Sequence, residues 1–215
     1  MAVKPLGVLG GTFDPIHHGH LRLALECYER LALDEVRLIP LHTPPHRHVP
    51  IAEPAHRLAM LQLAVAEHSA LVADDREIQR SGVSYTIDTL RSLREQRNSQ
   101  PLCTIMGLDA FQTLDSWRDW RLILEYSHII VVNRPGSPVS FESEEIAHLF
   151  EKNSVTDPSD LQQQPAGTIL KIDIPMLDIS ATRIRQLVSE KRDTHFLLPD
   201  SVINYIEQHD LYKTA

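Results

Sequence analysis

The sequence predicts an α/β fold with a doubly wound, mainly parallel sheet and helices on both faces. Short apolar runs typical of buried strands recur along the 215 residues. Segments in which apolar residues follow helical spacing stand between most of these runs. We find neither an internal repeat nor a second core. Because parallel strands need crossover connections, the alternation of strands and helices favours a parallel sheet.

The first half of the chain supplies three expected strands and three expected helices. The run LGVLGG at 6–11 indicates a buried strand that ends in a glycine turn. From Gly19 the period becomes helical, with one apolar face and charged residues elsewhere. Further along, we expect a strand at 35–41, a helix at 54–68, a strand at 71–78 and a helix at 86–97.

The second half continues the alternation and ends in helices. We expect strands at 102–107, 128–133 and 168–174, a short helix from Asp109, and helices at 181–191 and 199–209. The polar segment 152–167, which contains two prolines, is expected to be an exposed loop. The whole pattern predicts a single domain over 1–215, with 180–215 as a small C-terminal helical subregion.

Composition excludes several classes of protein. The formal net charge is −8 and the isoelectric point is about 5.8, which disfavours unspecific binding to nucleic acid. Cys27 and Cys103 are the two cysteines, so neither a disulfide framework nor a cysteine zinc site is indicated. The sequence shows no signal peptide and no apolar run of transmembrane length, so a cytoplasmic protein is expected.

The stretch GGTFDPIHHGH at 10–20 is unusually rich in glycine and histidine. Gly10 and Gly11 end the first expected strand, where they allow positive φ and let backbone N–H groups approach a ligand. His17 and His20 are three residues apart across the start of a helix, so they can face the same way. Because a helix N-terminus carries positive partial charge, the pattern favours an anion.

Two other interpretations of this stretch stay open. The glycines with Asp14-Pro15 are also compatible with a plain tight turn. The clustered histidines are compatible with a zinc site, although one bent loop rarely supplies three ligands and no cysteine assists. The histidines concerned are His17, His18 and His20, with His42, His46 and His48 nearby.

A second stretch, DISATRIRQL at 178–187, also indicates an anion site. Ser180 is a natural N-cap, but the capping-box position holds Arg183 instead of Glu or Gln. Arg183 and Arg185 place cations in the first turns, where each costs roughly 0.3–1 kcal/mol against the helix dipole unless an anion binds. With Ser180 and Thr182 they can form a phosphate cradle. A solvated basic face is the alternative.

These two stretches resemble signatures of the nucleotidyltransferase superfamily, namely (H/T)xGH and ISSTxIR. Within it, the chain resembles the bacterial nicotinate-nucleotide adenylyltransferase family. Further matching segments are PPHR (44–47), SYTIDTL (84–90), IMGLDAF (105–111), SWRDW (116–120) and VVNRPG (131–136). They cover most of the chain in the family's order. Ala181 and Arg47 depart from the family's usual Ser and Lys, and Ala181 cannot bind phosphate through its side chain.

The resemblance implies a Rossmann-like fold and transfer of the adenylyl group of ATP to nicotinate mononucleotide. The products would be deamido-NAD and pyrophosphate, formed by direct in-line attack without a covalent enzyme intermediate. His17, His20 and Arg185 would be catalytic, and Mg²⁺ would arrive on the ATP phosphates, with no metal site on the protein. The ATP-binding set would be Gly11, Thr12, Phe13, His17, His20, Gly107, Asp109, Ile179, Ser180, Thr182 and Arg185.

The second substrate would be bound by residues in the middle of the chain. By resemblance, Trp117 would stack on nicotinate and Thr86 would contact its carboxylate, with His46, Arg47 and Arg134 on the ribose-phosphate side. Structural alternatives stay open for several candidates of both substrate sites. Trp117 and Trp120 are compatible with one core face, Asp109 with an N-cap, and Thr86 with a cap of the helix that follows it.

Three functions remain open from the sequence. The first is the nicotinate enzyme, and the second is another adenylyltransferase of the superfamily, acting on nicotinamide mononucleotide or phosphopantetheine. The third is a catalytically silent nucleotide-binding module, which would have no reason to keep His17, His20 and Arg185. In each, ATP or a related nucleotide is the partner, and neither nucleic acid nor membrane is expected.

Overall fold

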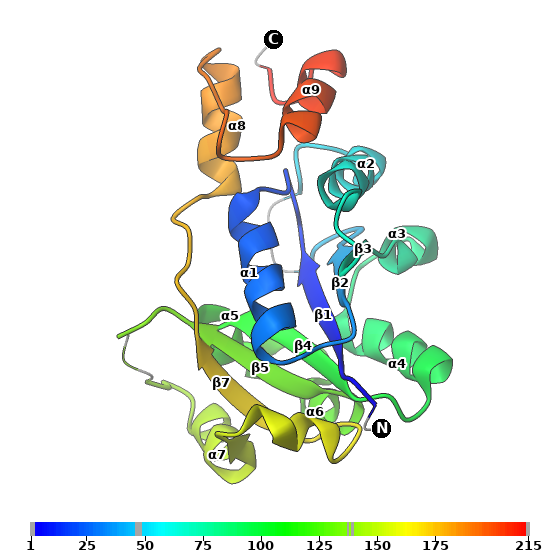
Figure 1. The fold of residues 1–215 in the computed structure, drawn as a ribbon, viewed down its shortest axis with the longest axis vertical. Coiled ribbons are helices and arrows are strands. Elements are labelled where there is room, and N and C mark those ends of the chain that lie inside the picture. Colours follow the sequence, from blue (N-terminus) through cyan, green and yellow to red (C-terminus); the bar gives the residue numbers. More distant parts are fainter. Residues whose placement is uncertain (1–2, 46–48, 137, 139, 214–215) are drawn as a thin grey trace. The chain divides into compact units, whose positions relative to one another are not determined.

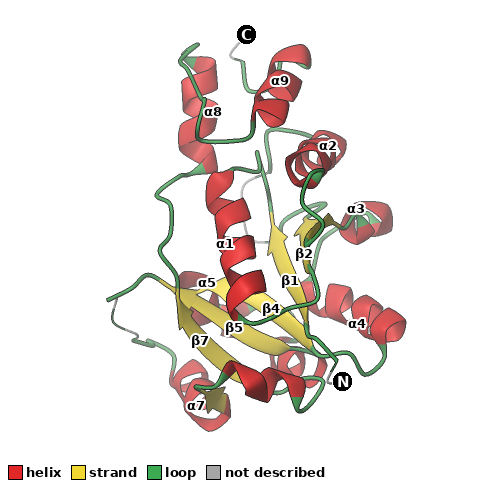
Figure 2. Cartoon of the chain, viewed as in Figure 1, coloured by secondary structure: helices red, strands yellow, loops and turns green. Residues whose placement is uncertain are grey.

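The computed structural model describes residues 3–45, 49–136, 138 and 140–213. The chain divides into two compact units, which we describe separately. Figure 1 labels the helices and strands. Unit 1 comprises Met1–Gly10, Glu26–Val36 and Tyr85–Pro175. Unit 2 comprises Gly11–Leu25, Arg37–Ser84 and Met176–Ala215. Figure 2 shows how strands and helices alternate along the chain in both units.

Unit 1 is built on parallel strands. Their order in the sheet is β1 (Leu6–Gly11), β4 (Leu102–Gly107), β5 (His128–Asn133), β7 (Ile169–Asp173) and β6 (Ser154–Val155). Every pairing among them is parallel, with Leu6 opposite Leu102 and Ile130 opposite Leu170. Strand β5 is buried along its whole length, which explains why it reads as a continuous apolar run.

The helices of unit 1 lie between its strands in the chain. They are α4 (Thr86–Arg97), α5 (Leu108–Gln112), α6 (Ile123–Tyr126) and α7 (Glu144–Asn153), with 3₁₀ turns at Leu114–Ser116, Trp120–Leu122 and Pro158–Gln162. The expected exposed loop at 152–167 is therefore wrong in part, because it holds the end of α7, strand β6 and a 3₁₀ turn. Leu161 is fully buried and anchors this segment.

Unit 2 contains β2 (Val36–Pro40), β3 (Leu71–Ala73), α2 (Pro54–Val65), α3 (Arg76–Arg80), α8 (Ala181–Ser189) and α9 (Asp200–Gln208). Helix α1 (His18–Arg30) begins in unit 2 and ends in unit 1. The expected strand at 71–78 is too long. It stops before Asp74, whose carboxylate accepts hydrogen bonds from the backbone and side chain of Arg76 and so starts a helical turn.

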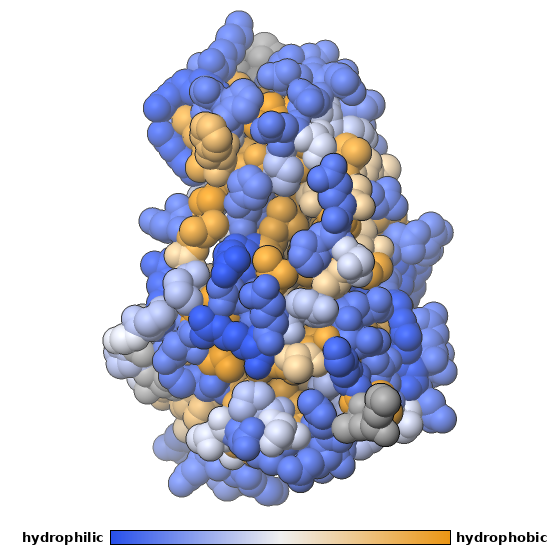
Figure 3. Space-filling model, in the orientation of Figure 1, coloured by the Kyte–Doolittle hydropathy of each residue, from blue (hydrophilic) through white to orange (hydrophobic). Residues whose placement is uncertain are grey.

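The predicted fold class is confirmed, whereas the prediction of one domain with a C-terminal subregion stays a prediction. Within the described residues, no helix is long and apolar enough to cross a bilayer. Hydrophilic residues cover much of the face drawn in Figure 3, with hydrophobic residues exposed between them. Single exposed apolar side chains such as Val49 and Phe196 are common on protein surfaces.

Candidate active site

The glycine-histidine loop at 10–20 starts where β1 ends. A Cβ on Gly11 would lie 2.8 Å from the Phe13 ring, so glycine is required there by packing. Neither Gly10 nor Gly11 has a positive φ, which corrects our expectation. The left-handed residue is Phe13, with φ of 48° and a buried ring. Backbone strain of this kind is often kept where it shapes a functional loop.

His17 and His20 form a stacked pair across the start of α1. Their ring centroids are 3.7 Å apart with an interplanar angle of 24°, and the edge of Phe13 packs on His20. Burial, with the nearby charge of His18, lowers the pKa of His17 to about 4. Burial, with the charge of His17, lowers the pKa of His20 to about 3. Both imidazoles are therefore neutral near pH 7.

Three polar atoms of this loop are buried and have no hydrogen-bond partner within the described part of the chain. They are Thr12 Oγ1, His17 Nδ1 and His20 Nδ1. Because unpaired buried polar groups each cost about 1–3 kcal/mol, their concentration in one loop indicates a site that a polar ligand completes.

A buried arginine that the sequence analysis missed holds this loop in place. Arg57 in α2 is fully buried and donates to the carbonyl oxygens of Thr12 at 2.7 Å, His42 at 3.0 Å and Ala52 at 3.1 Å. Burial lowers the pKa of Arg57, and the nearby Asp14 carboxylate opposes that shift. The signal in the sequence was an arginine at the start of the largely apolar run RLAMLQLAV, because a buried cation needs several acceptors.

The start of α8 lies against the same loop. A Cβ on Gly19 would lie 3.0 Å from the His17 ring and 3.6 Å from the carbonyl oxygen of Ile179. The predicted N-cap is confirmed, since Ser180 Oγ accepts the N–H of Arg183 at 3.2 Å. Gly19 therefore allows the histidine pair and the α8 start, both in unit 2, to approach each other.

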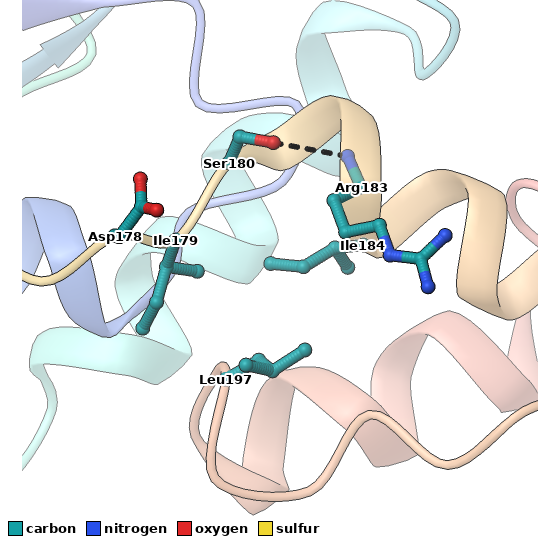
Figure 4. A pocket seen from close by; sticks show the side chains of 6 residues that line it. All are labelled: Asp178, Ile179, Ser180, Arg183, Ile184 and Leu197. Atoms are coloured by element: carbon teal, nitrogen blue, oxygen red, sulfur yellow. Dashed lines mark hydrogen bonds between the residues drawn. The ribbon is translucent and has the colours of Figure 1, made fainter.

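The side chains of the α8 start are paired with one another. Arg185 donates to Thr182 Oγ1 at 3.3 Å and to the carbonyl oxygen of Asp14 at 2.7 Å. Arg183 donates to Gln186 Oε1 at 2.9 Å. A pocket of about 280 Å³ opens beside this turn (Figure 4). Its lining combines polar and apolar groups: Asp178, Ile179, Ser180, Arg183, Ile184 and Leu197.

The remaining ATP-site candidates lie in unit 1. Gly107 ends β4 and is the N-cap residue of α5, and Asp109 is exposed in the first turn of that helix. No side-chain hydrogen bond caps α5, so Asp109 is not the N-cap that the structural alternative required. The carboxylate thus stands at the carboxyl end of a parallel strand, the edge at which such sheets bind ligands.

Three candidates for the second substrate, Thr86, Trp117 and Arg134, also lie in unit 1. Thr86 is the first residue of α4, whose start has no side-chain cap, so Thr86 does not serve as the cap. Trp117 is partly exposed after a 3₁₀ turn, and Arg134 is exposed after β5. His46 and Arg47 lie outside the described residues.

The chain beside these candidates is held by cation–π and ionic contacts. The guanidinium of Arg118 lies 4.7 Å from the centroid of the Tyr85 ring, and Arg91 pairs with Asp119 at 3.7 Å. These contacts tie the segment that carries Trp117 to the helix that carries Thr86. Unit 1 thus holds those two candidates on connected elements.

The zinc alternative rests on more histidines than the structure describes. The rings of His17 and His20 are stacked on each other, and His46 and His48 lie outside the described residues. Over the described ranges, no group of three or more His, Cys, Asp or Glu side chains is arranged to hold a metal ion.

Comparison with known proteins identifies the family. The pattern of the cytidylyltransferase-like family matches residues 8–187. A probable nicotinate-nucleotide adenylyltransferase of Methylococcus capsulatus is 44% identical over 208 residues, which cover 96% of this chain and 99% of that protein. One of Marinobacter nauticus is 47% identical over 206 residues, or 95% of each chain. This chain belongs to the nicotinate-nucleotide adenylyltransferase family. It is a nucleotidyltransferase.

A solved structure supports the fold. The Plasmodium falciparum nicotinic acid mononucleotide adenylyltransferase complexed with NaAD has a TM-score of 0.72, 20% sequence identity and 97% coverage of both chains. At this identity the likeness shows the fold, which is the Rossmann-like fold expected from the sequence.

Proposed function

We propose that this chain transfers the adenylyl group of ATP to nicotinate mononucleotide and releases pyrophosphate and deamido-NAD. The observation that carries the proposal is the set of partnerless buried polar atoms in the loop of Thr12, His17 and His20, beside a helix start that bears Arg185. A polyphosphate supplies the acceptors that these donors lack. The family relatives carry the name of this activity.

The chemistry needs positioning more than a protein nucleophile. The mononucleotide phosphate is already ionised and attacks the α-phosphorus of ATP in line, so no general base and no covalent intermediate are required. His17 and His20, neutral at pH 7, serve as fixed N–H donors to the phosphates. Arg185 supplies the permanent charge, and Ser180, Thr182 and the backbone at 11–13 and Ile179 complete the ATP phosphate site.

The adenosine part of ATP and the nicotinate ring are bound by residues of unit 1. Gly107 and Asp109 take the adenosine part of ATP, because a carboxylate accepts hydrogen bonds from ribose hydroxyls. Trp117 stacks on the nicotinate ring, and Thr86 donates to its carboxylate. Arg134, with His46 and Arg47, binds the ribose phosphate. Support comes from the related Plasmodium enzyme, whose structures contain NaAD and APC.

Mg²⁺ enters the site on the ATP phosphates. Among the residues that the structure describes, the acidic Asp14 is engaged with backbone amides and Tyr212, and no three-ligand cluster is present. The donor set therefore suits a metal held by phosphate oxygens and water, which is a common arrangement for Mg²⁺.

We further propose a cytoplasmic enzyme that acts as one domain and has no nucleic-acid or membrane partner.

The test is the choice between nicotinate and nicotinamide mononucleotide. We expect wild-type kcat/KM to favour the acid by roughly 10²–10⁴, because two hydrogen bonds to an ionised acceptor are lost with the amide. Thr86→Ala should erode that ratio, whereas Trp117→Ala should weaken both substrates alike. Trp120→Ala is the matched control, since that ring lies beside Arg121 at 4.4 Å. EDTA should abolish activity, and added Mg²⁺ should restore it.

Equal use of the two mononucleotides would remove the nicotinate assignment. Preference for the amide, or use of phosphopantetheine, would point to another adenylyltransferase of the superfamily. ATP binding without pyrophosphate release from any acceptor would identify a silent nucleotide-binding module.

A further inference from the structure

Asp14, in the middle of the glycine-histidine loop, joins distant parts of unit 2. It is buried, with 4% of its surface exposed. Its carboxylate accepts hydrogen bonds from the backbone N–H of Ile51 at 2.8 Å and of Ala52 at 3.1 Å, and from the hydroxyl of Tyr212 at 2.7 Å. The carboxylate is thus fixed by two amides from one segment and by one side chain that lies 198 residues away.

Tyr212 adopts an unusual backbone conformation to make this contact. It follows α9 and has φ of 61°, in the left-handed region that is unfavourable for a non-glycine residue. Its side chain is nevertheless buried, with 8% of the residue exposed. Burial and the neighbouring Asp14 raise the pKa of Tyr212 well above its ordinary value, so its hydroxyl stays protonated and donates. The left-handed backbone and the buried side chain together indicate that the hydrogen bond from Tyr212 to Asp14 is a specific contact.

Asp14 also determines where the Arg185 guanidinium lies. The Asp14 carbonyl oxygen accepts from Arg185 Nη1 at 2.7 Å, and the same nitrogen is 3.8 Å from the Asp14 carboxylate. The Arg185 side chain is 22% exposed, so it is not fully enclosed by these partners. The carboxylate, which accepts from three other donors, makes only this long ion-pair contact with Arg185, and the exposed part of that cation stays available for an anion.

We propose that Tyr212 is a positioning residue that acts through Asp14 on Arg185, and so sets the affinity for the triphosphate of ATP. This rests on the proposed function. Without the Tyr212 hydroxyl, one carboxylate oxygen loses its strongest donor, and Asp14 turns toward Arg185. A closer Asp14–Arg185 ion pair then competes with the phosphates for the same guanidinium.

The experiment compares Tyr212→Phe with Tyr205→Phe. Tyr205 lies in α9, and its hydroxyl contacts His56 Nδ1 at 3.0 Å, so each variant loses one tyrosine hydroxyl contact near the end of the chain. We expect similar small losses in Tm. For Tyr212→Phe we expect KM for Mg-ATP and the calorimetric Kd for Mg-pyrophosphate to rise about tenfold, with KM for the mononucleotide unchanged. Tyr205→Phe should change neither.

A double-mutant cycle separates positioning from mere stability. In an Arg185→Ala background, Tyr212→Phe should have no further effect on pyrophosphate binding, because the residue through which it acts is gone. Additive losses, or equal behaviour of the two phenylalanine variants, would overturn the inference. If Tyr212→Phe does not fold, Asp14→Asn takes its place with the opposite expectation: a neutral amide cannot form an ion pair with Arg185, so the Kd for Mg-pyrophosphate should not rise, and a rise of about tenfold would overturn the inference. A wild type that binds pyrophosphate but forms no deamido-NAD contradicts the proposed function alone.

Discussion

The glycine-histidine loop and the start of α8 are both candidate phosphate-binding regions of unit 2, but their polar groups are in opposite states. In the loop, Thr12, His17 and His20 present buried polar atoms that have no described partner. At the α8 start, Ser180 and Thr182 already have partners on their own helix. One region is organised in advance for a ligand, and the other must exchange its hydrogen bonds when a ligand arrives.

The difference in organisation predicts a difference in catalytic role. Donors fixed before the reaction stabilise charge without rearrangement and act mainly on kcat. Groups that trade one hydrogen bond for another gain less and act mainly on binding, so they appear in KM. The loop can stay organised because Arg57 donates to the carbonyl oxygen of Thr12, and the Asp14 carboxylate is fixed by the N–H groups of Ile51 and Ala52.

The largest expected effect is that of His20→Ala. Loss of one preorganised donor should reduce kcat by roughly 10²–10³, with Tm nearly unchanged. The matched control is His18→Ala, because His18 is the neighbouring histidine to which we assign no substrate contact. Steady-state kinetics and thermal unfolding of both variants provide the measurement. A His20 variant that unfolds while His18→Ala stays fully active would reassign His20 to the fold.

An intermediate effect is expected on stability below neutral pH. The pKa of the buried His17 is about 4 in the folded protein and about 6.5 in the unfolded chain. Between these values the unfolded state binds more protons, so the free energy of unfolding falls as pH falls through this window. From pH 7 to pH 5 the free energy of unfolding should fall by about 2 kcal/mol on account of His17. Each proton bound only by the unfolded state contributes about 1.4 kcal/mol per pH unit, and it does so only below the pKa of 6.5.

Urea unfolding at several pH values tests this expectation. His17→Asn, which has no imidazole to protonate, should remove about half of this pH dependence, because His20 remains and burial lowers its pKa as well. A wild-type stability that is constant from pH 7 to pH 5 would mean that the histidine pair is not buried as neutral rings.

Local patterns in the sequence predicted much of the fold and part of the site. Helix α4 and strands β1, β4 and β5 match their expected bounds, since each rests on periodicity that one segment contains. Ser180 as an N-cap is likewise a local feature. Helix α7 was not expected, because its amphipathic run adjoins a polar, proline-containing segment.

The contacts that hold the loop could not be predicted in the same way. Arg57 acts on Thr12 across 45 residues, Arg185 on Asp14 across 171, and Tyr212 on Asp14 across 198. No periodicity links such positions, because they meet only after folding. The reason for Gly11 was also misjudged. We expected a positive φ, but a Cβ is excluded there by contact with the Phe13 ring, which the sequence does not reveal.

The smallest expected effect is that of Ser180→Ala, and it has a close control in Ser143→Ala. Each serine is an N-cap whose Oγ accepts a backbone N–H three residues on, in α8 and α7 respectively. Each variant should lose about 1 kcal/mol of stability. Because Ser180 also faces the proposed phosphates, its variant alone should raise KM for Mg-ATP, by roughly threefold to tenfold, with kcat within twofold of wild type. If Ser180→Ala instead lowered kcat and left KM unchanged, the α8 start would act like the glycine-histidine loop. The distinction between a region organised in advance and one that exchanges its hydrogen bonds would then be wrong.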